Sequence, residues 1–486
     1  MNFRMIGRII SFILIVEAAF MLPAMLLSAF GGQTRSATAF LITVGIILTA
    51  ACALWLLSKK AKKGFYARDG LVCVGFSWIV LSLFGALPFV ISGEIPSYID
   101  ALFEIASGFS TTGASILTNV EAMTRGMLLW RSTSHWLGGM GVLVFLLALV
   151  PISGRSDGFT MHLLRAESPG PDVGKLVPRM KQTATILYGM YILLTVLDFI
   201  FLIIGGMPVF DAVCISIGTA GTGGFGVLNS SIGGYSPYIQ VVCTVFMFLF
   251  GVNFTCYYLL FCGKIKNVLK DEELRWYLGT AVFAIAAITV TLLIAKTYST
   301  FGETLRHSAF QVGSLLSSTG FATTDFDMWP SFAKAILFSL MFIGASAGST
   351  GGGFKIGRGL IVIKILKRNV RQVLYPNKVQ AVRLNGRVVD ENVLRNTNAY
   401  LCAYVIVLLV SFLIVSIDGF STTTNLTAVV SCFNNMGPGL ESIGPTLNYS
   451  GYGTVSKIVL IIDMLAGRLE IFPILVLMSR SAWKRR

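Results

Sequence analysis

The sequence predicts an all-α polytopic membrane protein, on the basis of its composition, its long apolar stretches and the placement of its basic residues. Of its 486 residues, 55% are hydrophobic and only 13% are charged, and the mean hydropathy is +0.76. A soluble chain of this length carries more charge, so the composition excludes that class. The net charge of +15 does not indicate a nucleic-acid partner, because the basic residues gather in short loops between apolar stretches. Membrane lipid is therefore the expected surrounding.

Ten apolar stretches are long enough to cross about 30 Å of hydrocarbon. We place them at residues 8–31, 37–58, 70–93, 127–152, 182–205, 237–262, 276–296, 332–366, 398–417 and 453–479. Basic segments such as 59–63 and 364–387 follow the even-numbered stretches. Lys and Arg accumulate in the cytoplasmic loops of membrane proteins. Because the number of stretches is even, the sequence predicts a multi-pass protein with both termini in the cytoplasm.

An internal repeat follows the third, fifth, seventh and ninth stretches. Its four copies read "DALFEIASGFSTTGA", "DAVCISIGTAGTGGF", "HSAFQVGSLLSSTGF" and "TNLTAVVSCFNNMGP". Each copy begins 13 positions before its last glycine, and these glycines are Gly113, Gly224, Gly320 and Gly437. The copies are too short to cross a membrane, so each predicts a helix that enters and returns through a glycine turn. The predicted unit is span, re-entrant helix, glycine turn and span.

The repeat divides the chain into five parts, of which the first holds two spans outside the repeat. The predicted boundaries are 1–64 for the two amino-terminal spans and 65–160, 161–270, 271–375 and 376–486 for the four repeats. Backbone that is not helical is tolerated at membrane depth only where protein buries it or water reaches it. Four such turns that enter from one side are therefore expected to surround one pore.

The chemistry of the four turns indicates a path for a monovalent cation. The turns "STTG", "GTGG", "SSTG" and "NNMG" carry hydroxyls, amides and carbonyls but no charge. Uncharged oxygens replace the hydration shell of a monovalent cation, whereas sites for divalent ions use carboxylates. The short helix before each turn would point its partly negative carboxyl end at the path. The alternative is that each glycine turn only reverses the chain.

Five stretches resemble a known family: "FSTTGAS", "GTGGFG", "SSTGFATTDFDMWP", "RSTSHWLGGMGVLVF" and "LAGRLEIFPIL". They are similar to the superfamily of potassium transporters that comprises the Trk, Ktr and plant HKT proteins, and most similar to its TrkH/TrkG membrane subunits. The resemblance covers essentially the whole chain. It implies a potassium filter built from backbone carbonyls around one glycine per repeat.

The resemblance also implies which residues form the filter. They are Thr111, Thr112, Gly113, Thr222, Gly223, Gly224, Ser318, Thr319, Gly320, Asn435, Met436 and Gly437. Sodium-conducting plant relatives carry serine at the first glycine, so Gly113 favours potassium. The fourth turn, "NNMGPG", departs most from the pattern because it has no hydroxyl. The transported ion is therefore expected to be K⁺, and we expect the chain to bind no other cofactor.

The eighth stretch contains a predicted gate. Its 35 residues would extend about 50 Å as one helix, which exceeds the bilayer. A break over residues 344–353 would divide it, and the resemblance implies that this segment obstructs the pore beneath the filter. Its glycines are Gly344, Gly348, Gly351, Gly352 and Gly353. The segment "GSTGGGFK" lacks the spacing of a phosphate-binding loop.

Arg468 is the second part of the predicted gate, since it lies inside the tenth stretch. A charge within a span is costly and usually faces a cavity or a partner. The resemblance implies that it faces the pore and raises the barrier to cations. Two alternatives remain from the residues alone: an ion pair with Glu470 or Asp463, or a side chain that extends to the cytoplasmic surface.

Together these features predict a potassium uptake protein of the bacterial inner membrane. The resemblance implies a homodimer and a cytoplasmic TrkA-like regulatory subunit with nucleotide-binding domains, for which residues 364–387 offer a contact surface. The segment "KDEEL" at 270–274 is either a solvated helix start or a docking point for a regulator.

Two other functions were weighed against this one. A symporter coupled to protons or sodium is the main alternative. An enzyme is not indicated, because the sequence offers no nucleophile–base pair or metal motif within the spans.

Overall fold

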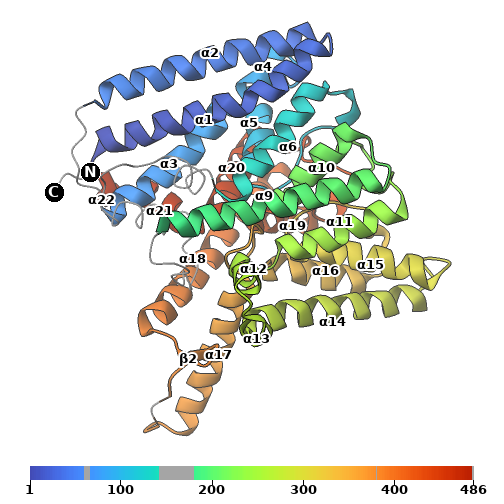
Figure 1. Ribbon diagram of the computed structural model, residues 1–486. Helices are drawn as coiled ribbons and strands as arrows, with labels where there is room; N and C mark the ends of the chain where they lie inside the picture. The colour runs from blue at the N-terminus through green and yellow to red at the C-terminus, as the bar shows by residue number, and fades with distance from the viewer. Residues whose placement is uncertain (60–65, 142–179, 379, 484–486) are drawn as a thin grey trace.

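The computed structural model describes residues 1–59, 66–141, 180–378 and 380–483, and these are mostly helical (Figure 1). Helices α1 (Phe3–Phe30) and α2 (Thr34–Leu57) form an antiparallel pair at one edge of the bundle. The aromatic rings of Phe3 and Trp483 stack with their centroids 6.3 Å apart. The first and last described helices therefore meet at one end of the molecule.

Among the described residues, six helices are long and apolar enough to cross a membrane. They are Phe3–Phe30, Thr34–Leu57, Arg68–Ser92, Thr185–Ile204, Glu272–Ile294 and Glu391–Asp418. The third consists of α3 (Ala67–Gly85) and α4 (Leu87–Ser92), the fourth lies in α9 (Met180–Ile204), the fifth is α14, and the sixth joins α18 (Glu391–Val415) to η3 (Ser416–Asp418). The chain is therefore a helical membrane protein, as the sequence predicts.

The other predicted spans are broken helices. The sixth is α11 (Pro237–Phe250) and α12 (Phe254–Phe261), which meet at 89°. The eighth is α16 (Ser331–Ile343) and α17 (Ile356–Leu374), and the tenth is α20 (Thr454–Arg468) and α21 (Phe472–Met478). The fourth begins as α6 (Arg125–Gly139), and its predicted second half lies outside the described residues. The sequence predicts only the break in the eighth.

A short helix precedes each of the four predicted glycine turns. These helices are α5 (Tyr98–Phe109), α10 (Val209–Gly221), α15 (Phe301–Leu316) and α19 (Thr422–Asn434). Their 12 to 16 residues extend about 18–24 Å, which is too short to cross a bilayer. Three begin at a hydroxyl cap, namely Ser97, Thr300 and Ser421, whose side chains accept a hydrogen bond from the first turn.

A β-hairpin connects the third repeat to the fourth. Strands β1 (Arg383–Leu384) and β2 (Arg387–Val388) pair antiparallel across Asn385 and Gly386, whose φ angles are 50° and 77°. Two residues with positive φ form the turn that suits the twist of a hairpin, and Asn-Gly is its preferred sequence. The hairpin and the end of α17 project from the bundle (Figure 1). The remaining elements are η1 (Val120–Ala122), α13 (Ile265–Leu269), η2 (Phe326–Met328), η4 (Glu441–Ile443) and α22 (Arg480–Trp483).

Candidate ion-conducting site

The four predicted glycines share one backbone conformation. The φ angles of Gly113, Gly224, Gly320 and Gly437 are 81°, 78°, 87° and 86°. The residues two positions earlier, Thr111, Thr222, Ser318 and Asn435, also have positive φ, between 53° and 60°. This conformation strains residues that carry a Cβ, and most of all a β-branched threonine. Such strain persists where the surrounding structure enforces it, which is typical of functional sites.

The same glycines form a closed ring, which we call the glycine ring. A Cβ added to any of them would collide with main-chain oxygen of the turn in the next repeat. These oxygens belong to Gly223 for Gly113, to Thr319 for Gly224, to Met436 for Gly320, and to Thr112 for Gly437, where the distance is 2.8 Å. The fourth repeat thus meets the first, and the four turns surround one axis. Side chains at these positions would force the turns apart.

A cavity of about 130 Å³ opens onto the glycine ring. All four ring glycines line it, together with loop residues such as Ser115, Asn229 and Asn448. This volume equals that of roughly four water molecules in the liquid. The ring is therefore reached from one side through a polar vestibule contributed by all four repeats.

Acidic side chains stand in the loops around this vestibule. The main-chain N–H of Glu441 donates to a carboxylate oxygen of Asp327 at 3.0 Å, and Lys334 lies 3.6 Å from the same Asp327 carboxylate. Hydrogen bonds from the hydroxyls of Ser421 and Thr424 lower the pKa of the Glu441 carboxyl. Glu441 therefore keeps its negative charge at neutral pH, which favours cations near the entrance.

Hydroxyl groups next to the ring follow a twofold pattern, although the glycines follow a fourfold one. Hydroxyl oxygens of Ser110 and Thr112 lie 2.7 Å apart in the first repeat, and Ser317 and Thr319 repeat this contact at 2.7 Å in the third. Glycine and methionine replace these threonines in the second and fourth repeats.

The fourth repeat uses an amide where the others have hydroxyls. The Asn435 side-chain NH₂ donates to the Thr112 hydroxyl at 3.0 Å and to the Met464 carbonyl at 2.8 Å. Asn435 thereby binds the fourth turn to the first and closes the ring without a hydroxyl of its own.

A buried ion pair supports the first two turns, and sequence reasoning missed it. The guanidinium of Arg131 lies 2.7 Å from the Glu104 carboxylate, and both side chains are at most 2% exposed. Glu104 also accepts hydrogen bonds from the Ile116 N–H at 3.0 Å and from the Ser115 hydroxyl. Arg131 stacks over the Phe225 ring at 4.0 Å. Lone charges in two apolar segments were the signal that would have found this pair.

The segment between α16 and α17, residues 344–355, lies directly beneath the turns of the third and fourth repeats. We call it the 344–355 loop. The Gly352 N–H donates to the Ser318 hydroxyl. A Cβ on Gly351 would come 2.6 Å from the Ser317 carbonyl oxygen, and one on Gly352 would collide with the Asn434 carbonyl. The loop therefore approaches the turns so closely that only glycine fits, and the predicted break is confirmed.

The 344–355 loop also fits against the break in the second repeat. The Ser346 N–H donates to the Gly251 carbonyl at 3.1 Å, and the Phe254 N–H donates to the Gly348 carbonyl at 3.1 Å. These bonds satisfy main-chain groups that the interrupted helices leave open. Main-chain groups at the break in the second repeat thus form hydrogen bonds with main-chain groups of the 344–355 loop in the third.

Arg468 connects the 344–355 loop to the first repeat. Its guanidinium donates to the carbonyl of Thr350 at 2.8 Å and to that of Gly138 at 2.6 Å, and it also bonds the Gly139 carbonyl. Gly138 and Gly139 end α6, where helix carbonyls lack helical partners and attract a positive charge.

The two carboxylates that the sequence offered as partners of Arg468 are held by other residues. The Glu470 carboxylate pairs with Arg358, and the Asp463 carboxylate accepts a hydrogen bond from Ser411 at 2.7 Å. Arg468 lies within the tenth predicted stretch, at a break that the sequence does not predict, because α20 ends at this residue and α21 begins at Phe472.

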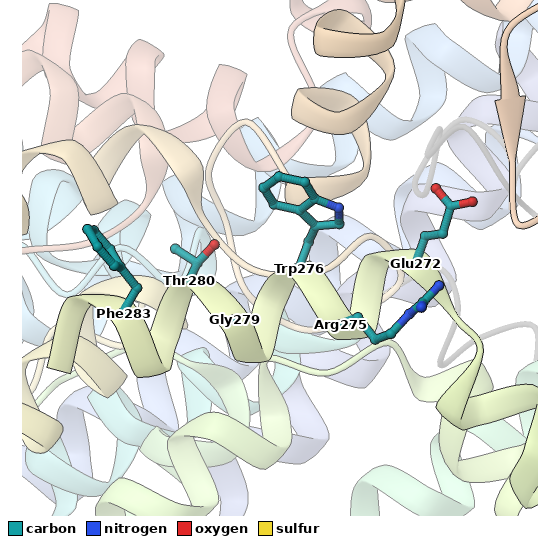
Figure 2. Close-up of a pocket in the computed structure, with 6 residues that line it drawn as sticks. All are labelled: Glu272, Arg275, Trp276, Gly279, Thr280 and Phe283. Atoms are coloured by element: carbon teal, nitrogen blue, oxygen red, sulfur yellow. The ribbon is translucent and has the colours of Figure 1, made fainter. Parts of the chain in front are cut away.

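Two larger cavities lie along α14 (Glu272–Ile294), away from the glycine ring. The first has a volume of about 590 Å³, and Figure 2 shows its lining side chains along one side of the helix, from Glu272 to Phe283. The second, of about 340 Å³, shares Trp276 and Thr280 with it and reaches Lys355. No predicted filter residue lines either cavity.

Comparison with known proteins identifies the family. A sequence profile of TrkH, described as a cation transport protein, matches residues 36–484. The chain belongs to the TrkH family. A TrkH-family protein is a transporter and not an enzyme, as the sequence predicts. Similar TrkH-family proteins include the "Trk system potassium uptake protein TrkH" of Salmonella typhimurium and that of Escherichia coli K12, each 34% identical over 490 residues with 100% of both chains covered.

A second Escherichia coli protein, the "Trk system potassium uptake protein TrkG", is 32% identical over 99% of both chains. Among solved structures, the potassium transporter TrkH from Vibrio parahaemolyticus matches with a TM-score of 0.88 and 30% identity over 100% of both chains. The resemblance noted in the sequence therefore holds for the whole length of this TrkH-family chain and for its fold.

Proposed function

We propose that this chain is the potassium-conducting membrane subunit of a bacterial Trk uptake system. The observation that carries this function is the closed glycine ring, in which each glycine abuts main-chain oxygen of the next repeat. Main-chain oxygens from four turns around one axis replace the water around a monovalent cation. The similar full-length proteins named as potassium uptake proteins support K⁺ as the ion.

The chemistry of the ring favours K⁺ over divalent ions. None of the four turns carries a carboxylate, which Ca²⁺ and Mg²⁺ sites use. The carboxyl ends of α5, α10, α15 and α19 precede the turns, so their partly negative ends favour a cation. The membrane potential drives inward movement of a cation by about 2.3 kcal/mol per 100 mV.

In this proposal, the 344–355 loop and Arg468 form the gate. The loop fills the space beneath the turns of two repeats, and the Arg468 guanidinium is bonded to it. The fixed positive charge repels cations that have passed the ring, and the small side chains let the loop move aside. The five glycines predicted for the gate belong to this loop, and three of them, Gly344, Gly348 and Gly353, have positive φ.

The proposed assembly is a homodimer in the bacterial inner membrane, with the termini and the 364–387 surface in the cytoplasm. A TrkA-like regulatory subunit with nucleotide-binding domains would bind that surface. Lys364 and Arg368 on it already pair with Glu272 and Glu391, so the remaining basic residues are the more available contacts. The repeat boundaries 65–160, 161–270, 271–375 and 376–486 belong to the same proposal.

The test is Gly113→Ser, measured as growth of a potassium-uptake-deficient bacterium on low K⁺ and as ion flux into proteoliposomes. We expect loss of K⁺ uptake or gain of Na⁺ permeability, because a Cβ at Gly113 collides with the Gly223 carbonyl. Gly206→Ser is the matched control, since Gly206 has a φ of 80° but no neighbouring atom within 4 Å of an added Cβ.

Two outcomes count against the proposal. If Gly113→Ser has the same K⁺ flux and the same Na⁺ flux as the wild type, the proposed filter is contradicted. A reversal potential that depends on pH or on Na⁺, rather than on K⁺ alone, would indicate coupled symport instead of the proposed K⁺ conductance.

A further inference from the structure

Three consecutive acidic residues at the start of α14 bind other segments of the chain, and the third of them, Glu273, is buried. Asp271 caps the helix, with its carboxylate accepting a hydrogen bond from the Leu274 N–H at 2.8 Å. The sequence offered a solvated helix start here, which is wrong for Glu273, since that residue is only 9% exposed. Each of the three side chains binds a part of the chain more than 70 positions away.

Glu273 holds both ends of the 344–355 loop. A single carboxylate oxygen accepts hydrogen bonds from the Ala347 N–H at 2.7 Å and from the Gly357 N–H at 3.0 Å. Ala347 lies near the start of the loop, and Gly357 is the second residue of α17. A Cβ on Gly357 would come 2.8 Å from this oxygen, so glycine permits the approach. Glu273 thus also caps α17, where a negative charge is favourable.

The neighbouring residues bind the cytoplasmic hairpin. The Asn385 side chain accepts from the Glu272 N–H at 2.7 Å and donates to the Asp271 carboxylate at 2.8 Å. The Asn385 N–H donates to the Glu272 carboxylate at 3.0 Å, and Lys364 pairs with that carboxylate as well. Figure 2 shows the Glu272 side chain at the end of α14, beyond the cavity-lining Trp276. The hairpin is therefore hydrogen-bonded to Glu272, the residue next to Glu273.

We propose that Glu273 is a positioning residue that fixes the 344–355 loop beneath the glycine ring, and that the hairpin at Asn385 adjusts it through the start of α14. The inference rests on the proposed function, because the loop is a gate only if the ring conducts ions. One carboxylate oxygen that accepts from two main-chain N–H groups, one in the loop and one in α17, holds both segments at once. Movement of the hairpin shifts the turn that carries Glu273, since the three residues are consecutive in one helix start.

The experiment compares Glu273→Leu with Glu272→Gln in the full-length chain in lipid nanodiscs and proteoliposomes. Glu272→Gln is the matched control, because the Gln side-chain oxygen can still accept from the Asn385 N–H, so the hairpin stays bound, and because Glu272 bonds no loop amide. The readouts are hydrogen–deuterium exchange of residues 344–357 and K⁺ flux without a partner protein. In Glu273→Leu we expect the exchange rate of residues 344–357 and the K⁺ flux each to rise about tenfold, which corresponds to about 1.4 kcal/mol. In Glu272→Gln we expect the exchange rate and the flux each to change by less than about twofold.

Asn385→Ala tests the link to the hairpin. We expect exchange in 344–357 to rise by about twofold, because the start of α14 loses hydrogen bonds that hold it. Unchanged exchange in this variant would overturn the part assigned to the hairpin.

The outcomes separate this inference from the proposed function. A folded Glu273→Leu protein with unchanged exchange in 344–357 overturns the inference, whatever the ion flux. If residues 344–357 exchange faster in Glu273→Leu but the wild-type protein conducts no K⁺, the positioning role of Glu273 is supported and only the proposed function is contradicted. If Glu273→Leu does not fold, Glu273→Asp keeps the charge but withdraws the oxygen by one methylene. The inference then requires faster loop exchange in Glu273→Asp, and equal exchange overturns it.

Discussion

The glycine ring and the layer beneath it are built from the same four repeats, yet only the ring is regular. At the ring, all four glycines have φ between 78° and 87° and each abuts the next turn. Beneath it, the four second helices end after 13 to 15 residues, and the three whose continuation the structure describes differ from one another. One leads into a 12-residue loop, another bends by 89°, and a third ends at Arg468.

This difference shows which part of a repeat the common axis constrains. Each of the four turns abuts the next one, so a change in one turn disturbs the whole ring. In the layer below, the 344–355 loop donates a hydrogen bond to the Gly251 carbonyl, and Arg468 bonds both the loop and the Gly138 carbonyl. The first helices, such as α14 and α18, face lipid along much of their length and remain unbroken.

The largest expected effect concerns the support behind the ring. Arg131→Met leaves the Glu104 carboxylate buried without its partner, so we expect the free energy of unfolding to fall by about 3–5 kcal/mol. Denaturant or thermal unfolding in detergent measures this. Lys457→Met is the control, because the Asp100 carboxylate it pairs with is 27% exposed, and should cost under about 1 kcal/mol. Equal costs would show that the ring does not depend on the buried pair.

The second prediction tests the fourfold equivalence of the ring. Alanine at Gly113, Gly224 or Gly320 should each reduce K⁺ flux by about a hundredfold, since it adds both a clash and a strained φ. Gly437→Ala should lose less, because its nearest approach, 2.8 Å, is the widest of the four. Rubidium uptake into proteoliposomes measures the series. A tolerated substitution in any of the first three would break the regularity of the ring.

The third prediction concerns the irregular layer. Arg468→Met removes the hydrogen bonds to Thr350, Gly138 and Gly139, so flux without a partner should rise by about tenfold. Arg468→Lys keeps the charge but not the fork of donors, and a rise with Lys as large as with Met would assign the effect to hydrogen bonding rather than to charge. Flux that does not rise with Met would remove Arg468 from the gate.

The smallest expected effect on ion conduction is that of removing the Tyr449 hydroxyl, which bonds the fourth turn at Gly437. Tyr449 donates to the Gly437 carbonyl at 2.8 Å, so Tyr449→Phe should weaken that turn by about 1 kcal/mol and lower the preference for K⁺ over Na⁺ by about fivefold. Tyr452→Phe is the matched control, because the Tyr452 hydroxyl bonds the Asn425 side chain and not the ring. Reversal potentials under K⁺ and Na⁺ gradients measure both, and equal shifts would deny Tyr449 a specific role.

Sequence reasoning located the ring because the repeat has a fixed offset from its first residue to its glycine. It located a break over residues 344–353 because five glycines within ten residues are incompatible with a helix. It missed the ends of the helices at Gly139 and Gly251, where three glycines and one glycine interrupt an apolar run and helix packing decides the outcome. It also missed the hairpin at Asn385, although Asn-Gly between strand-forming residues was a usable signal.

The sequence by itself determined that this chain crosses a membrane, that it repeats one unit four times and that its glycine turns are uncharged. Composition and spacing are properties of the chain alone, so no contact was needed to read them. Only the tertiary structure decided that the turns close into a ring, that Glu104 finds Arg131 and that Glu273 faces a loop 74 residues away. A buried charge, or a main-chain N–H without a helical partner, bonds the polar group that the packing of the helices places within about 3 Å. The separation of the two groups along the chain does not predict which group that is.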